Sequence, residues 1–173
     1  MGELQHKDMF DIAGRGISRI WRYDLLHTDF TAGATTETKT LDPLVESGET
    51  LSGGGVIIQD AFILLHTAFA GPNITRLDLQ LGDATNGVHA YLDDVQVQSA
   101  GHGTLGLKGN TVAEKGDLLV DAAGRSAGAT PYLAEAVAIT CTLDTNGTDN
   151  LSATTAGRAT LCIVYYEIPS RLP

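Results

Sequence analysis

The pattern in this sequence with the most direct chemical meaning lies at residues 124–128 (GRSAG), which fit the G-x-S-x-G turn of a hydrolase nucleophile. That chemistry needs a strand before the serine, a helix after it and a histidine later in the chain. Residues 129–131 (ATP) do not start a convincing helix, and all five histidines precede Ser126. The sequence therefore favours a glycine-rich loop, and we expect no catalytic residues and no enzymatic activity.

Two groups of carboxylate and amide side chains have the oxygen atoms that Ca²⁺ prefers. They are Asp83, Asn86, Asp93 and Asp94 in one segment, and Asp144, Asn146, Asp149 and Asn150 in another. Neither group has the spacing of a calcium-binding loop, and Asp and Asn also favour turns for reasons of their own backbone. The histidines and cysteines lack metal-ligand spacing as well. We therefore expect no metal and no cofactor.

Arginine and aromatic residues crowd one short stretch near the start of the chain. Arg15, Arg19, Trp21, Arg22 and Tyr23 are residue types enriched where proteins bind one another most tightly. One interpretation is a first strand whose Trp21 covers its own core, and the other is an arm that docks on a neighbouring subunit. These five residues are the candidate partner-binding site.

A sugar-binding surface would need stacking rings, and aromatic residues make up only 6% of the chain. Tyr165 and Tyr166 are adjacent, so in a strand they face opposite sides, which predicts one tyrosine in the core and one at the surface or an interface. Tyr91 and Tyr132 are the surface tyrosines to test if the protein binds carbohydrate. Cys141 and Cys162 lie in apolar, strand-like runs, and we expect both to be buried free thiols.

The elements that must position these residues are short strands separated by turns. Residues 75–81 alternate cleanly, with Leu77, Leu79 and Leu81 on one face, which is typical of a half-buried strand. Asp144-Thr145-Asn146-Gly147 predicts a hairpin. Residues 91–97 read as a helical turn followed by a strand. Further strands are expected at residues 36–41, 49–51, 56–69, 105–107, 118–120, 134–143 and 159–168.

Composition excludes several classes of protein. The 173 residues are 43% hydrophobic and 18% charged, which is too apolar for a disordered chain. No apolar stretch approaches the roughly 20 residues of a membrane-spanning helix. A net charge of −10 disfavours nucleic acids and anionic membranes as partners. The first ten residues lack the apolar segment of a secretory signal, so we expect synthesis in a cytoplasm without export.

These observations predict an all-β fold: an antiparallel β-sandwich, jelly-roll-like, with an extended N-terminal arm. Residues 1–35 differ in composition from the rest, so we assign them to an arm or docking segment and residues 36–173 to the sandwich. This division predicts that deletion of residues 1–35 weakens docking on a partner but leaves the sandwich folded.

From residue 54 to residue 168 the layout resembles small virion proteins of tailed bacteriophages. The similarity rests on a strand near residues 53–58 (GGGVII), on residues 67–69 (TAF), on residues 77–83 (LDLQLGD), on residues 91–95 (YLDDV) and on residues 155–168 (TAGRATLCIVYYEI). Such proteins are β-sandwich or jelly-roll parts of the particle, often head decoration (cement) proteins. The resemblance brings no active site with it.

The resemblance implies a structural virion protein on the phage head surface, made in the host cytoplasm, that binds the major capsid protein and stabilises the head. It also implies a homo-oligomer, a trimer or dimer, because lattice sites are symmetric. Two alternatives remain open. One is another virion component, such as a tail, neck or head-fibre subunit, and the other is a carbohydrate-binding or host-adhesion module.

Overall fold

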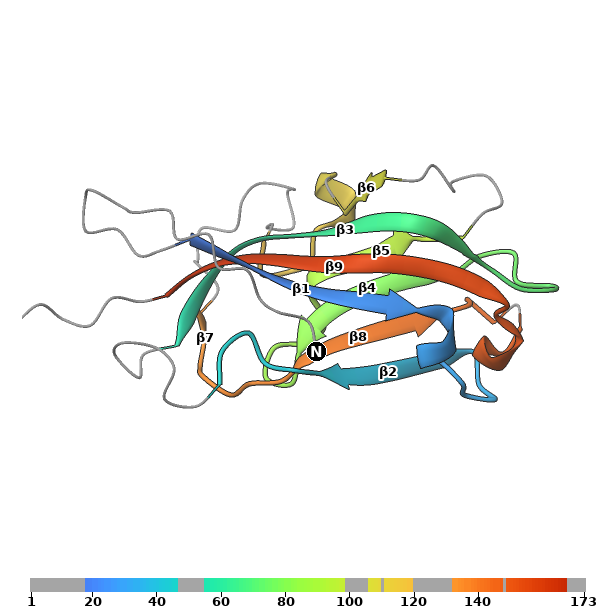
Figure 1. Cartoon of the computed structure of the whole chain (residues 1–173), viewed down its shortest axis with the longest axis horizontal. Coiled ribbons are helices and arrows are strands. Elements are labelled where there is room, and N and C mark those ends of the chain that lie inside the picture. Colours follow the sequence, from blue (N-terminus) through green and yellow to red (C-terminus); the bar gives the residue numbers. More distant parts are fainter. Residues whose placement is uncertain are drawn as a thin grey trace, which may run out of the picture.

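The computed structural model describes residues 18–46, 55–98, 106–109, 111–119, 132–147 and 149–167. These residues form two antiparallel β-sheets packed face to face, so the predicted all-β sandwich is confirmed (Figure 1). Three short 3₁₀ helices, η1 (His27–Asp29), η2 (Val112–Glu114) and η3 (Leu151–Ala153), complete the described structure. In this part of the chain no helix has the length and apolarity needed to cross a membrane.

The strands divide between two sheets. Sheet one has the order β1 (Ser18–Leu26), β9 (Ala156–Glu167), β3 (Val56–Ala70) and β6 (Gly106–Lys108), and the short β7 (Tyr132–Leu133) also pairs with β3. Sheet two has the order β2 (Thr36–Leu41), β8 (Ile139–Asp144), β4 (Asp78–Asp83) and β5 (Gly87–Gln96).

The strand pairs are nested along the chain. β1 pairs with β9, β2 with β8, β3 with β6, and β4 with β5, all antiparallel. A long hairpin wound around a barrel gives this pairing, and it places four of these strands in each sheet. Two four-stranded sheets connected in this way form a jelly roll, as the sequence predicted.

The core lies between the sheets, where side chains of every second strand residue meet. Leu77, Leu79 and Leu81 are fully buried, as their alternation predicted. Cys141 and Cys162 are both buried and free, which confirms the expectation for the two thiols. Burial raises the pKa of each thiol, so both remain protonated and unreactive at neutral pH.

Strand β1 corrects the predicted boundary between arm and sandwich. All nine of its residues pair with β9, from Ser18 opposite Tyr166 to Leu26 opposite Arg158. Leu25 is fully buried and Phe30 nearly so. The sandwich therefore includes residues 18–35, which the sequence assigned to the arm, while residues 1–17 lie outside the described residues.

Several expectations about strands and turns were wrong. The strand expected at residues 134–143 begins only at Ile139, because residues 134–138 include a turn in which Ala136 adopts φ 59°. Asn146 and Gly147 do adopt positive φ (53° and 76°), but the strands they separate belong to different sheets, so no β8–β9 hairpin forms. β5 is a strand from Gly87 onward; a bulge with Asp94 at φ 47° breaks its alternation, which made it resemble a helical turn. Residues 117–119 form a turn, in which the Leu118 amide donates to the Ala90 carbonyl. The strand expected at residues 49–51 lies outside the described residues.

Candidate interaction surfaces

The predicted partner-binding residues are divided between the two faces of β1, because successive side chains of a strand point to opposite sides. Arg19, Trp21 and Tyr23 are half-buried and alternate with the exposed Arg22. Arg15 lies outside the described residues. The structure therefore brings Trp21 and Tyr23 together and places Arg22 on the outer face of sheet one.

Trp21 and Tyr23 form a stacked pair at the β1 edge of the sandwich. Their ring centroids are 6.0 Å apart with an interplanar angle of 13°. Both rings pack against the hydrophobic core while remaining partly exposed. Burial, assisted by the nearby carboxylate of Asp29, raises the pKa of Tyr23. The two rings therefore cover the core between the edge strands and still present surface to the outside.

Arg19 anchors β1 to the end of β9. Its Nε lies 2.9 Å from Oε1 of Glu167, whose side chain is nearly buried. A buried carboxylate needs such a partner, because an unpaired buried charge is costly. This ion pair gives Arg19 a structural role within sheet one.

The outer face of sheet one carries the exposed apolar residues. Four large apolar side chains are exposed among the described residues: Ile20 (45%), Leu26 (42%), Leu107 (51%) and Tyr132 (53%). Ile20 and Leu26 lie on the outer side of β1, since the alternating Leu25 is buried. Leu107 lies opposite Leu64 and Tyr132 opposite Ile57, and both of these β3 residues alternate with buried ones. All four therefore lie on one face of one sheet.

Half-buried apolar side chains connect Ile20, Leu107 and Tyr132, whereas Leu26 lies opposite Arg158, beside the polar Asp24 and Thr160. Val164 lies opposite Ile20, and Tyr166 lies between Ser18 and Ile57 in the strand register. We call the connected set the apolar face: Ile20, Ile57, Phe62, Leu64, Leu107, Tyr132, Val164 and Tyr166. A contiguous apolar patch on a protein surface usually marks an interaction site.

The tyrosine pair at the end of β9 is divided as predicted. Tyr165 is buried in the core, where its hydroxyl donates to the Leu44 carbonyl at 3.3 Å. Tyr166 is half-buried and belongs to the apolar face. Tyr91, in contrast, is fully buried, so it is no surface tyrosine and cannot stack on a sugar.

Polar groups that share the outer side of sheet one bond mainly to each other. Asp24 accepts a hydrogen bond from the Thr160 hydroxyl at 2.6 Å and lies 3.4 Å from Nη2 of Arg158. These contacts, the Thr160 bond above all, hold the pKa of Asp24 below its ordinary value. His66 is an exposed strand residue whose Nε2 is 2.8 Å from the Thr160 hydroxyl, which agrees with its predicted strand position.

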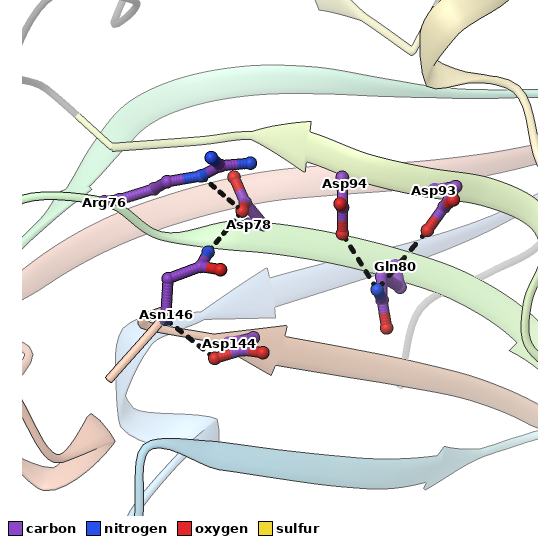
Figure 2. Close-up of polar contacts among 7 residues, drawn as sticks. All are labelled: Arg76, Asp78, Gln80, Asp93, Asp94, Asp144 and Asn146. Carbon is purple, nitrogen blue, oxygen red and sulfur yellow. Dashed lines mark hydrogen bonds and ion pairs between the residues drawn. The ribbon is translucent and has the colours of Figure 1, made fainter. Parts of the chain in front are cut away.

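The outer face of sheet two is polar and acidic. Gln80 of β4 donates from its amide to Asp94 at 2.9 Å and to Asp93 at 3.3 Å (Figure 2). Across β2 and β8, the hydroxyls of Thr38 and Thr142 are 2.8 Å apart. Burial and the adjacent Asp94 raise the pKa of Asp93. The two outer faces of the sandwich thus differ sharply in chemistry.

Asp78 is the buried carboxylate of this acidic face. Its Oδ2 accepts from Nε of Arg76 at 2.6 Å and from Nδ2 of Asn146 at 2.5 Å (Figure 2). Its Oδ1 is buried and has no hydrogen-bond partner among the described residues. Burial raises the pKa of Asp78, although both donors act in the opposite direction.

The structure rearranges the two predicted calcium groups. It joins Asp144 and Asn146 to Asp78, and Asp93 and Asp94 to Gln80. Asp83 instead accepts from Asn86 and from the Tyr91 hydroxyl. Within the described ranges, no three His, Cys, Asp or Glu side chains are grouped to hold a metal ion. The glycine-rich serine pattern at 124–128 lies outside these ranges.

The burial of Asp78 leads to a pH-dependent prediction. The pKa of Asp78 in the folded chain lies above its ordinary value of 3.8. Between these two pKa values the folded chain keeps a proton that the unfolded chain has released. The free energy of unfolding therefore falls as the pH rises from the lower pKa to the higher one. Asp78→Asn should remove this effect. We expect it to be as stable as wild type at pH 7, or more stable by up to about 1 kcal/mol, with any advantage vanishing near pH 3. Urea unfolding from pH 3 to 7 tests this; a large loss at pH 7 with an unchanged pH slope would contradict it.

The apolar face was missed by the sequence analysis, although the sequence carries a signal for it. In β3 and β9, apolar residues occupy consecutive positions instead of alternating with polar ones. Continuous apolar runs are typical of strands covered on both faces. The sequence of these two strands is therefore typical of a sheet whose outer face is also buried, here against another surface.

Comparisons with known proteins give no relative. No protein-family model, no curated protein and no solved structure matches this chain.

Proposed function

We propose that the protein is a structural component of a phage particle, a head decoration protein that binds the major capsid protein through the apolar face. The observation that supports this most is the position of Ile20, Leu26, Leu107 and Tyr132, all exposed on one face of sheet one. Burying a large apolar side chain contributes about 1.5–3 kcal/mol. Docking of this face on a protein surface would recover that free energy several times over.

The outer face of sheet two supports an orientation in which the apolar face lies against the shell. The outer side of sheet two carries the partly exposed Asp93, Asp94 and Asp144, and the whole chain has a net charge of −10. An acidic, hydrogen-bonded surface stays hydrated and keeps particles apart. A decoration protein needs this asymmetry, with one face against the shell and one toward solvent.

The fold adds an argument by analogy. Jelly rolls recur in viral capsid domains, although they also serve other functions. Together with the resemblance in residues 54–168, this makes a virion role the best-supported reading of the apolar face. A structural role also requires no catalytic or metal centre.

Co-sedimentation tests the proposal. Purified protein is mixed with shells assembled from the major capsid protein of the same genome, and bound protein is measured against concentration. We expect saturable binding at a fixed ratio to capsomers. A folded protein that does not bind shells, and instead binds tail or neck proteins, would contradict the decoration role and favour another virion position.

A further inference from the structure

Strand β1 is an edge strand with a free side. It is the terminal strand of sheet one and pairs only with β9 among the described residues. Every second residue of such a strand points its N–H and C=O groups away from the sheet, which makes the edge a template for another strand. Proteins usually protect long edges with proline or bulges. β1 is nine residues long, contains no proline and pairs with β9 in unbroken register.

Along this edge, one cationic and one anionic side chain flank Tyr23, and an apolar side chain lies beyond each of them. On the outer face, Ile20 and Arg22 precede Tyr23, and Asp24 and Leu26 follow it. Arg22 is exposed and makes no ion pair with any described residue, while Asp24 is an exposed carboxylate with a lowered pKa. The edge therefore presents an unsatisfied cation two residues from an anion.

From this pattern we infer that two copies of the chain pair through β1, antiparallel, around a two-fold axis at Tyr23. In this register Arg22 lies opposite Asp24 of the second copy, and Ile20 lies opposite Leu26 of the second copy. Because the two copies are related by a two-fold axis, each of these pairs occurs twice in the dimer. Cross-strand pairs of opposite charge, and of apolar side chains, stabilise a sheet.

Neighbouring registers lack this complementarity. With a two-fold axis perpendicular to the sheet, the pleat requires the axis to pass through a residue, so that outer side chains face outer side chains. An axis at Arg22 or at Asp24 sets two like charges opposite each other. An axis at Trp21 places Ile20 against Arg22 and leaves Asp24 opposite Ser18. Only the Tyr23 register of these four pairs opposite charges.

The pairing would have two structural consequences. Sheet one would continue across the axis into sheet one of the second copy, so the two apolar faces would form a single larger face. On the inner side, the partly exposed ring of Tyr23 would face the same ring of the second copy, and Trp21 would lie opposite Leu25 of the second copy. The second effect buries apolar surface that a single chain leaves exposed.

Charge exchange tests the pairing. The dissociation constant of the dimer is measured by analytical ultracentrifugation for wild type, R22E and D24R, each alone and as an equal mixture of the two variants. Wild type should dimerise, and each variant alone should dissociate at least about tenfold more readily (~1.4 kcal/mol). In the mixture, R22E presents two acidic and D24R two basic side chains, so heterodimers should form as in wild type.

Lys108→Glu is the charge control, since it makes the same charge change on β6, at the far edge of sheet one; because Lys108 lies opposite the buried Ile63, urea unfolding checks that this variant is folded. It should leave the dissociation constant unchanged. R22E removes no described ion pair, so it tests the pairing even if D24R, which loses the Thr160 and Arg158 contacts, folds poorly. A monomeric wild type, or an R22E dimer as tight as wild type, would overturn the inference. No shells are present, so this result is independent of the decoration role.

Discussion

A chain that lacks residues 1–35 is expected to fail to fold, whereas one that lacks only residues 1–17 should keep the sandwich. The longer deletion removes β1 and with it the buried side chains of Leu25 and Phe30 and the half-buried Trp21 and Tyr23. At about 1.5–3 kcal/mol for each fully buried side chain, the loss approaches the total stability of a domain, about 5–15 kcal/mol. It also leaves β9 as an unpaired edge.

Circular dichroism with urea unfolding of both truncated chains measures this effect. The shorter deletion serves as the control, because it removes none of the contacts described for the sandwich. A cooperative unfolding transition in the chain lacking residues 1–35, at a urea midpoint near that of wild type, would show that β1 is dispensable and would restore the original boundary at residue 35.

Asp83→Ala is expected to lower the free energy of unfolding by at least about 3 kcal/mol. The Asp83 carboxylate is buried at the end of β4 and accepts four hydrogen bonds. Two come from the amides of Thr85 and Asn86, one from the Asn86 side chain and one, at 2.5 Å, from the Tyr91 hydroxyl. Alanine would remove the acceptor of all four bonds and would leave the Tyr91 hydroxyl, which is inaccessible to water, without a partner.

Tyr91→Phe separates the contribution of the hydroxyl from that of the turn. Burial and the Asp83 carboxylate raise the pKa of Tyr91, so its hydroxyl remains a donor throughout the accessible pH range. Removing it should cost about 1.5–3 kcal/mol, less than Asp83→Ala, because Asp83 keeps three other donors. Urea midpoints of the two single variants and the double variant give the coupling. Equal stability of Asp83→Ala and wild type would contradict a structural role for this network.

Strand identity was predictable wherever side chains alternate or apolar runs are long. Residues 36–41 form β2 at the predicted bounds, and the predicted strand at 56–69 differs from β3 by one residue. Local pattern failed at the bulge of β5, where Asp94 adopts positive φ and shifts the alternation. A period of two is a reliable sign of a strand only while the register stays regular.

Connections between sheets were not predictable from local sequence. Asn146 and Gly147 adopt the left-handed backbone that a tight hairpin uses. In this fold the same turn lets the chain leave sheet two, and Asn146 is instead fixed by its bond to Asp78, 68 residues earlier. Which strand β8 joins is decided by packing across the sandwich, and a turn sequence carries no information about that.

The candidate sites show the same division. The residue types in β1 pointed to an interface, but the sequence did not show whether the side with Trp21 and Tyr23 or the side with Arg22 faces the core. A strand at residues 105–107 and a surface position for Tyr132 were expected, and β6 and the exposed Tyr132 agree with this, but nothing in the local sequence places Leu107 and Tyr132 on the same face. Their pairing with β3 brings them onto the apolar face.

The most direct test of the central claim is shell binding by Leu107→Lys compared with Thr40→Lys. Both positions are exposed, one on the apolar face and one on the outer face of sheet two, so neither lysine should disturb folding by more than about 0.5 kcal/mol. We expect Leu107→Lys to bind capsid shells at least about tenfold more weakly than wild type, because a buried lysine would lose its hydration, and Thr40→Lys to bind as wild type does. Unchanged binding by Leu107→Lys would show that the apolar face does not dock on the shell.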